Sequence, residues 1–149
     1  MAEENYLLAV RLIPQDPMYQ TNHGDLYHRL ERSEEAQERY RLACELLEGW
    51  VADDPDNPES LTNLAFYSAK SHDCGRAMTL VPQLEELLPD TGPNAHMLAY
   101  INALCGEEDA AMEALTRAIT LGESTELIRQ EDEFQALRDR SDFRSLVGG

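Results

Sequence analysis

Lysine is almost absent from this chain, where Lys70 stands beside eleven arginines. These basic residues oppose 29 acidic residues and leave a formal net charge of −17. Nucleic-acid binding needs a basic patch that neutralises phosphates. No run of lysine and arginine supplies such a patch, so we exclude nucleic acid and anionic membranes as partners. The acid excess favours solubility and basic partners. A lysine-poor, acid-rich composition resembles that of proteins from salt-adapted or GC-rich bacteria.

Long apolar runs are also missing. No stretch approaches the length of about 18 apolar residues that a membrane span needs. The start Met1-Ala2-Glu3-Glu4 lacks the positive charge of a signal peptide. We therefore expect a cytoplasmic protein. The three cysteines show no Cys-x-x-Cys spacing and cannot all pair, so we expect Cys44, Cys74 and Cys105 to be reduced and mostly buried.

What the chain does have is helical spacing. Apolar residues recur every three or four positions and two-residue alternation is rare, which predicts helices and no strand. Asp16-Pro17, Asn57-Pro58 and Gly92-Pro93 each place a capping residue before a proline, as at many helix starts. Ser33 is predicted to cap a further helix. At 149 residues, the length favours one domain.

Small residues recur in one register along these helices. The middle of the chain shows the pattern clearly, with Leu64-Ala65, then Ala77-x3-Val81, then Pro89. A larger side chain at such a helix contact would overpack it and cost about 1–3 kcal/mol. The spacing resembles the tetratricopeptide repeat, a helix–turn–helix unit of about 34 residues. The same register places Ala36, Ala65, Ala77, Ala99 and Ala111 at helix contacts.

The resemblance implies an all-α superhelix of about three helix–turn–helix repeats, with an N-terminal half repeat and a C-terminal helical cap. Tyr6, Ala9 and Pro14 resemble the end of a second helix that lacks its first. A register slip lengthens one helix, from Ser33 to about Asp53. Within a single domain spanning 1–149, we expect a half repeat at 1–16, repeats at 17–56, 57–90 and 91–123, and the cap at 124–149.

Some residues depart from the repeat pattern. Gln20 and His23 stand where large apolar residues are expected, so the first repeat is a weak match. Glu123 replaces the closing proline of the third repeat. Pro82 falls inside a predicted helix, where a proline costs about 3 kcal/mol. The sequence offers no feature that compensates for it.

Residues that carry chemistry do not gather into a recognised motif. His23 and His28 are five positions apart and point away from each other on a helix, whereas zinc motifs on helices use a spacing of four. The acidic stretch 53–57 lacks the turn glycine and distal glutamate of a calcium loop. We therefore expect no metal, no cofactor and no enzymatic activity. Asp25 is predicted to pair with Arg29, four positions on.

The inner surface of such a stack gives the candidate site, because the first helix of each pair lines the concave face. Phe66 and Tyr100 occupy equivalent positions there, as do Asn63 and Met97. Aromatic and methionine side chains suit peptide binding, although the two aromatics are equally suited to fill gaps between helices. The predicted partner-binding residues are Asp25, His28, Arg29, Thr62, Asn63, Phe66, Lys70, His96, Met97 and Tyr100.

A second predicted interface lies on the lengthened helix. Leu47, Trp50 and Val51 follow one another along it, and an exposed tryptophan is a typical interface anchor. We expect these residues to support a homodimer.

The sequence thus favours a non-catalytic scaffold or adaptor that binds a peptide or protein segment in its concave groove. Two alternatives stand beside it. One is a small acidic chaperone for a secretion substrate or partner protein. The other is a structural fragment of a longer repeat array, which the half repeat at the start would suit.

Overall fold

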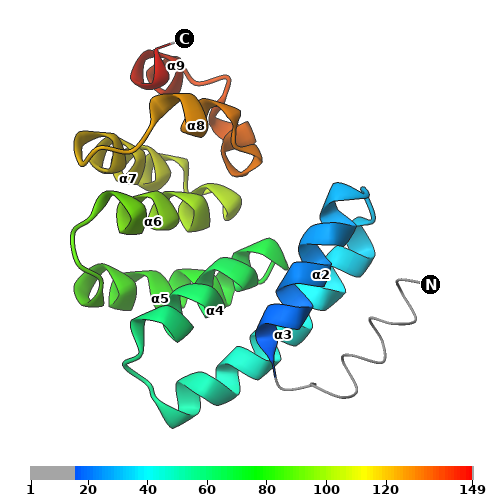
Figure 1. Cartoon of the computed structure of the whole chain (residues 1–149). Coiled ribbons are helices and arrows are strands. Elements are labelled where there is room, and N and C mark those ends of the chain that lie inside the picture. The colour runs from blue at the N-terminus through cyan, green and yellow to red at the C-terminus, as the bar shows by residue number, and fades with distance from the viewer. Residues whose placement is uncertain (1–15, 149) are drawn as a thin grey trace. The chain divides into compact units, whose positions relative to one another are not determined.

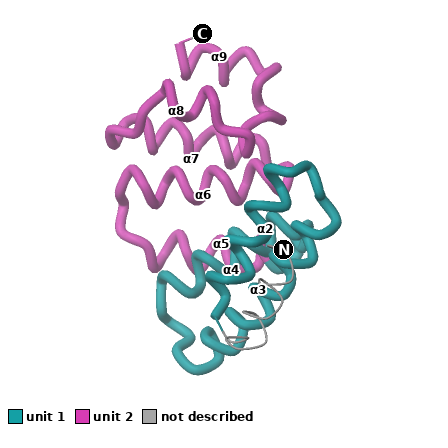
Figure 2. The backbone as a smooth tube through the Cα atoms, turned by 45° about the vertical axis from the view of Figure 1, so that its right-hand side comes forward, with its two compact units in different colours: residues 1–76 teal, residues 77–149 magenta. Residues whose placement is uncertain are grey.

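The computed structural model describes residues 16–148, and the regular elements in that range are all helices. The predicted half repeat, with Tyr6, Ala9 and Pro14, lies outside the described residues except for Asp16. The chain divides into two compact units, residues 1–76 and 77–149 (Figure 2). The predicted all-α class with packed adjacent helices is confirmed.

Unit 1 contains α2 (Pro17–Arg29), α3 (Ser33–Asp53), α4 (Pro58–Lys70) and the start of α5 (Cys74–Leu87) (Figure 1). Helix α2 packs against α3, and α3 packs against α4. The predicted lengthening of one helix is confirmed by α3, which runs for 21 residues.

The first residues of α2 and α4 follow the predicted caps. One carboxylate oxygen of Asp16 accepts the backbone N–H of Met18 at 2.9 Å. The side-chain oxygen of Asn57 accepts the N–H of Ser60 at 3.0 Å. In both helices a proline follows the cap, where its missing N–H leaves no bond unmade.

Two predicted caps are displaced by one residue. Ser33 is the first helical residue of α3 rather than its cap, which is Arg32. At the start of α6 (Gly92–Leu104) the cap is Thr91, whose hydroxyl accepts the N–H of Asn94 at 3.3 Å. Thr91 holds an extended backbone and carries an oxygen, so it can satisfy an N–H that Gly92 has no side chain to reach.

The core of unit 1 depends on a close approach between α2 and α3. Tyr27, Ala36 and Tyr40 form one buried cluster. A Cβ added at Gly24 would stand 2.7 Å from Cε1 of Tyr40, closer than side chains pack. The absence of a side chain at Gly24 therefore lets the Tyr40 ring lie flat against α2.

Unit 2 contains the remainder of α5 and the helices that follow it (Figure 1). Helix α6 packs against α7, η1 packs against α6, and α8 packs against α9. The prediction of short helices after residue 124 is confirmed. The elements after α6 are α7 (Glu108–Thr120), α8 (Thr125–Gln130), the 3₁₀ helix η1 (Asp132–Leu137) and α9 (Ser141–Val147).

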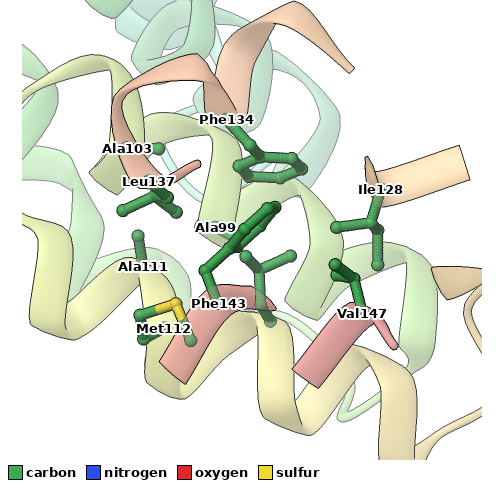
Figure 3. Packing of buried hydrophobic residues seen from close by; sticks show 10 residues of the cluster. Ala99, Ala103, Ala111, Met112, Ile128, Phe134, Leu137, Phe143 and Val147 are labelled. Carbon is green, nitrogen blue, oxygen red and sulfur yellow. The ribbon is translucent and has the colours of Figure 1, made fainter. Parts of the chain in front are cut away.

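The C-terminal cap, defined here as α8, η1 and α9, supplies much of the core of unit 2. Phe134, Leu137 and Phe143 from the cap pack among small residues of α6 and α7, including Ala99 and Ala111 (Figure 3). Phe134 and Leu137 are completely buried. Full burial of one such side chain contributes about 1.5–3 kcal/mol, so the cap is part of the fold of unit 2.

The register of small residues is confirmed by burial. Ala65 in unit 1 and Ala77, Ala99 and Ala111 in unit 2 have no exposed surface, and Ala36 is nearly as buried. Each lies where a longer side chain would collide with a neighbouring helix.

Two other residues depart from expectation. Helix α5 continues through Pro82 to Leu87, and no contact in the described structure explains this proline. The prediction of reduced cysteines is confirmed for Cys44, which is a buried free thiol. It is wrong for Cys74 and Cys105, neither of which is a free thiol.

Replacing Ala111 with leucine tests the packing of unit 2. Ala111→Leu is expected to lower the free energy of unfolding by about 1–3 kcal/mol, because the added atoms have no space at a fully buried contact. Urea denaturation measures this change. Ala110→Leu is the matched control, because Ala110 is exposed on the same helix, and equal effects of the two substitutions would contradict the packing.

Candidate functional site

The predicted site residues of unit 1 come from α2 and α4, and two of them meet. Nζ of Lys70 on α4 lies 3.5 Å from a carboxylate oxygen of Asp25 on α2. The Lys70 side chain is 19% exposed and that of Asp25 is 43% exposed, so the pair is partly open to solvent. Two positions that are 45 residues apart in the sequence therefore share one surface.

A buried phenol holds the carboxylate of Asp25. The hydroxyl of Tyr40 donates to Oδ1 of Asp25 at 2.6 Å, and Tyr40 itself is buried on α3. The partners of Asp25 are thus Tyr40 and Lys70, in place of the predicted Arg29. Tyr40 was not among the site residues predicted from the sequence, because it lies on α3, the second helix of its pair.

Aromatic rings surround the ammonium group of Lys70. Its Nζ lies 4.8 Å from the ring centre of Phe66 and 5.2 Å from that of Tyr40. At such distances a cation is attracted to the negative face of an aromatic ring. We call Asp25, Tyr40, Phe66 and Lys70 the Asp25–Lys70 cluster. It brings a carboxylate, a cation and two aromatic rings together on one partly exposed surface.

The buried side of this cluster continues to Tyr67. The rings of Tyr40 and Tyr67 stack with centroids 5.6 Å apart. Burial raises the pKa of the Tyr67 phenol, an effect that a hydrogen bond with Thr21 partly opposes. Tyr67 therefore stays neutral at physiological pH and acts as packing behind the cluster.

The remaining candidates of unit 1 differ in exposure. His28 and Arg29 are exposed near the end of α2, whereas Asn63 is half-buried. The hydroxyl of Thr62 donates to the carbonyl of Pro58 at 2.7 Å, a bond within its own helix. These four residues lie on α2 and α4 and remain predicted site residues.

The predicted site residues of unit 2, His96, Met97 and Tyr100, are all half-buried on α6. The ring of Tyr100 stacks on that of Phe134 in the cap, with centroids 5.0 Å apart. Both ring nitrogens of His96 meet carboxylates, those of Glu123 and Glu131. Sequence reasoning missed this cover, although Glu123 had drawn notice for replacing a proline.

The predicted second interface is only partly at the surface. Trp50 is 45% exposed and Val51 is half-buried near the end of α3. Leu47 is 1% exposed and lies in the core of unit 1. Because Leu47 is buried, Trp50 carries this surface without it.

Unit 2 also has a hollow that sequence reasoning did not anticipate. It has a volume of about 330 Å³ and is lined by residues of α5, α6 and α7. Leu84, Leu88 and Leu98 form its apolar side, and an ion pair between Arg117 and Asp90 stands at its edge. The lining residues do not indicate which kind of ligand the hollow would hold.

Residues 16–148 contain neither a metal-binding cluster nor a membrane-spanning helix. No group of three or more histidine, cysteine, aspartate or glutamate residues in that range is arranged to hold a metal ion. Within the same residues, the helices are too short or too polar to cross a bilayer.

Comparison with known proteins places a repeat in unit 1. The family model of the tetratricopeptide repeat matches residues 19–46, which span most of α2 and the first part of α3. Together with the packed adjacent helices, this match supports a tetratricopeptide repeat protein. No curated protein matches the sequence. The matched repeat is the one whose Gln20 and His23 had made it the weakest prediction.

Removing one hydroxyl tests the link between α3 and the candidate site. Tyr40→Phe is expected to lower the free energy of unfolding by about 1–2 kcal/mol, because the bond to the Asp25 carboxylate is lost while the ring remains. Urea denaturation of Tyr40→Phe, Asp25→Ala and the double variant forms a double-mutant cycle. Additive effects of the two substitutions would show that the bond contributes nothing.

Proposed function

We propose that this chain is a non-catalytic adaptor that binds a peptide or protein segment on the first helices of its helix pairs. Tetratricopeptide repeats are protein-interaction modules, which supports the class of function. The binding surface in unit 1 is centred on the Asp25–Lys70 cluster. The groove, the partner and the absence of catalysis are parts of this proposal.

The meeting of Asp25 and Lys70 across α2 and α4 carries the proposal. Both were chosen from the sequence because they lie off the packing stripe of a first helix. Their contact brings charge and the edge of Phe66 together on a partly exposed surface. Aromatic anchors beside oriented polar groups are typical of the centres of protein interfaces.

The charge of the chain indicates the chemistry of its partner. With a net charge of −17, the molecule attracts basic segments and repels acidic ones. Lys70 already faces Asp25, so a partner cation would compete for that carboxylate, while the partner's main chain or an aromatic side chain would lie along Phe66. We propose a basic peptide or protein as the partner, met in the cytoplasm, and neither nucleic acid nor membrane.

The same acidity favours a second candidate function. A strongly charged surface keeps a bound, otherwise insoluble protein in solution. A small chaperone for a secretion substrate would use the same helices but would hold a partner that aggregates when alone. Light scattering of the captured partner with and without this chain distinguishes the two functions.

Substitution of Phe66 tests the adaptor function. A partner would first be captured from cells that make the protein, and its binding segment then measured by calorimetry. Phe66→Ala is expected to weaken binding at least tenfold, or about 1.4 kcal/mol, because an aromatic anchor is lost. Arg41→Ala, on an exposed part of α3, is the control. Unchanged affinity in both Phe66→Ala and Lys70→Ala would place binding elsewhere.

We further propose that Trp50 and Val51 pair two copies of the chain. Trp50 exposes nearly half of a large apolar side chain, and burying it against another copy would remove that area from water. Light scattering at micromolar concentration is expected to give a dimer mass that Trp50→Ala reduces to that of a monomer. A monomer mass for the unaltered chain would contradict this interface.

A further inference from the structure

One histidine in unit 2 lies between two carboxylates. Nδ1 of His96 on α6 is 3.1 Å from Glu123, and Nε2 is 2.7 Å from Glu131. The His96 side chain is 12% exposed, and the two glutamate side chains are 26% and 24% exposed. Glu123 lies in the loop after α7, and Glu131 joins α8 to η1, so the ring connects α6 to that loop on one side and to the cap on the other.

These two contacts require one more proton than a neutral ring and two ionised carboxylates carry together. Neutral imidazole has one N–H donor and one acceptor nitrogen, whereas an ionised carboxylate only accepts. With both glutamates ionised, only the doubly protonated ring donates to both. With a neutral ring, one glutamate must carry the proton. In either form the three groups hold one extra proton and a net charge of −1.

We propose that His96, Glu123 and Glu131 share one proton that fastens the cap to α6, and that its loss at higher pH loosens the segment around Glu131. Without it, a lone pair of the ring faces a carboxylate at hydrogen-bond distance, which is repulsive. The consequence for partner binding rests on the proposed function, because His96 and Tyr100 are predicted partner-binding residues that this segment covers.

The surroundings of Glu131 favour retention of the shared proton. Phe134 stacks on His96 with centroids 5.9 Å apart, and Tyr100 lies on the ring at 4.7 Å. Removal from water raises the pKa of the Glu131 carboxyl, and the negative charge of Glu133 raises it further, while the hydrogen bond from His96 opposes both effects. Loss of water thus favours a protonated cluster.

Two arginines on the neighbouring elements are directed to other groups. On the cap, the guanidinium of Arg138 donates to the backbone carbonyl of Glu131 at 3.1 Å. On α7, Arg117 is paired with Asp90. The carboxylates of Glu123 and Glu131 contact His96, and the charge of Glu133 acts on Glu131.

The direction of the pH effect follows from linkage. The docked segment binds the proton more tightly than the open segment, so docking is favoured at low pH and weakens as pH rises. For Glu131 the effect begins above the ordinary carboxyl value of 4.5, since its pKa is raised. Release of one proton changes the opening equilibrium by at most about tenfold per pH unit.

Hydrogen exchange of the Phe134 amide measures this opening, because its N–H bonds to the carbonyl of Glu131 at 3.2 Å. In the full chain, exchange corrected for its intrinsic pH dependence would be followed by NMR from about pH 5.5 to 8.5, across the ordinary range of histidine. Protection is expected to fall with pH, by up to about tenfold per unit.

Two conservative variants separate a proton clamp from simple packing. In Glu131→Gln the amide donates to Nε2 of a neutral ring, and in Glu123→Gln it donates to Nδ1, so neither variant needs the extra proton. In at least one of these two variants, the protection of the Phe134 amide is expected to stay constant across the pH range. Glu133→Gln, which does not touch the ring, should retain the slope of the unaltered chain.

A flat profile in the unaltered chain, or the same slope in both Glu131→Gln and Glu123→Gln, would overturn the inference. The measurement uses no partner, so its failure leaves the proposed adaptor function untouched. Conversely, a chain that binds no peptide would still show the exchange profile if the clamp is correct.

Discussion

Close contact between helices is the constraint on which the rest of this structure depends. Ala65, Ala77, Ala99 and Ala111 are completely buried, and Gly24 has no room for even one more carbon beside Tyr40. Helix backbones approach closely only where side chains are this small. That approach determines which faces of α2 and α4 turn away from the core, and so which residues can meet a partner.

The sequence predicted the helices well, because their spacing and their capping residues are local properties. The bounds of α3 and the caps at Asp16 and Asn57 illustrate this. The sequence pattern favoured Gly92 over Thr91 as the cap, because Gly92 directly precedes Pro93. The family match fell on the least convincing repeat, where buried Gln20 and His23 masked a register that Gly24, Tyr27 and Ala36 still carried.

The candidate site was less predictable, because its geometry depends on contacts between distant residues. Asp25 was assigned to Arg29, its neighbour on one helix, but Tyr40 and Lys70 from other helices bind it. Likewise, helical position alone made His96 and Tyr100 appear open, whereas Glu131 and Phe134 return from the cap to cover them. Periodicity shows which face of a helix a residue occupies. It does not show which residues of other helices pack against that face.

The scarcity of lysine gives the Asp25–Lys70 cluster an unusual chemical property. Lys70 carries the one ε-amino group of the chain, and it stands between a carboxylate and two aromatic rings. Any reagent or enzyme that acylates lysine side chains therefore has a single side-chain target, at the centre of the proposed binding surface. Acetylation there would cancel the positive charge and leave Asp25 facing a neutral amide, so one modification would alter the surface while the rest of the molecule stayed unmarked.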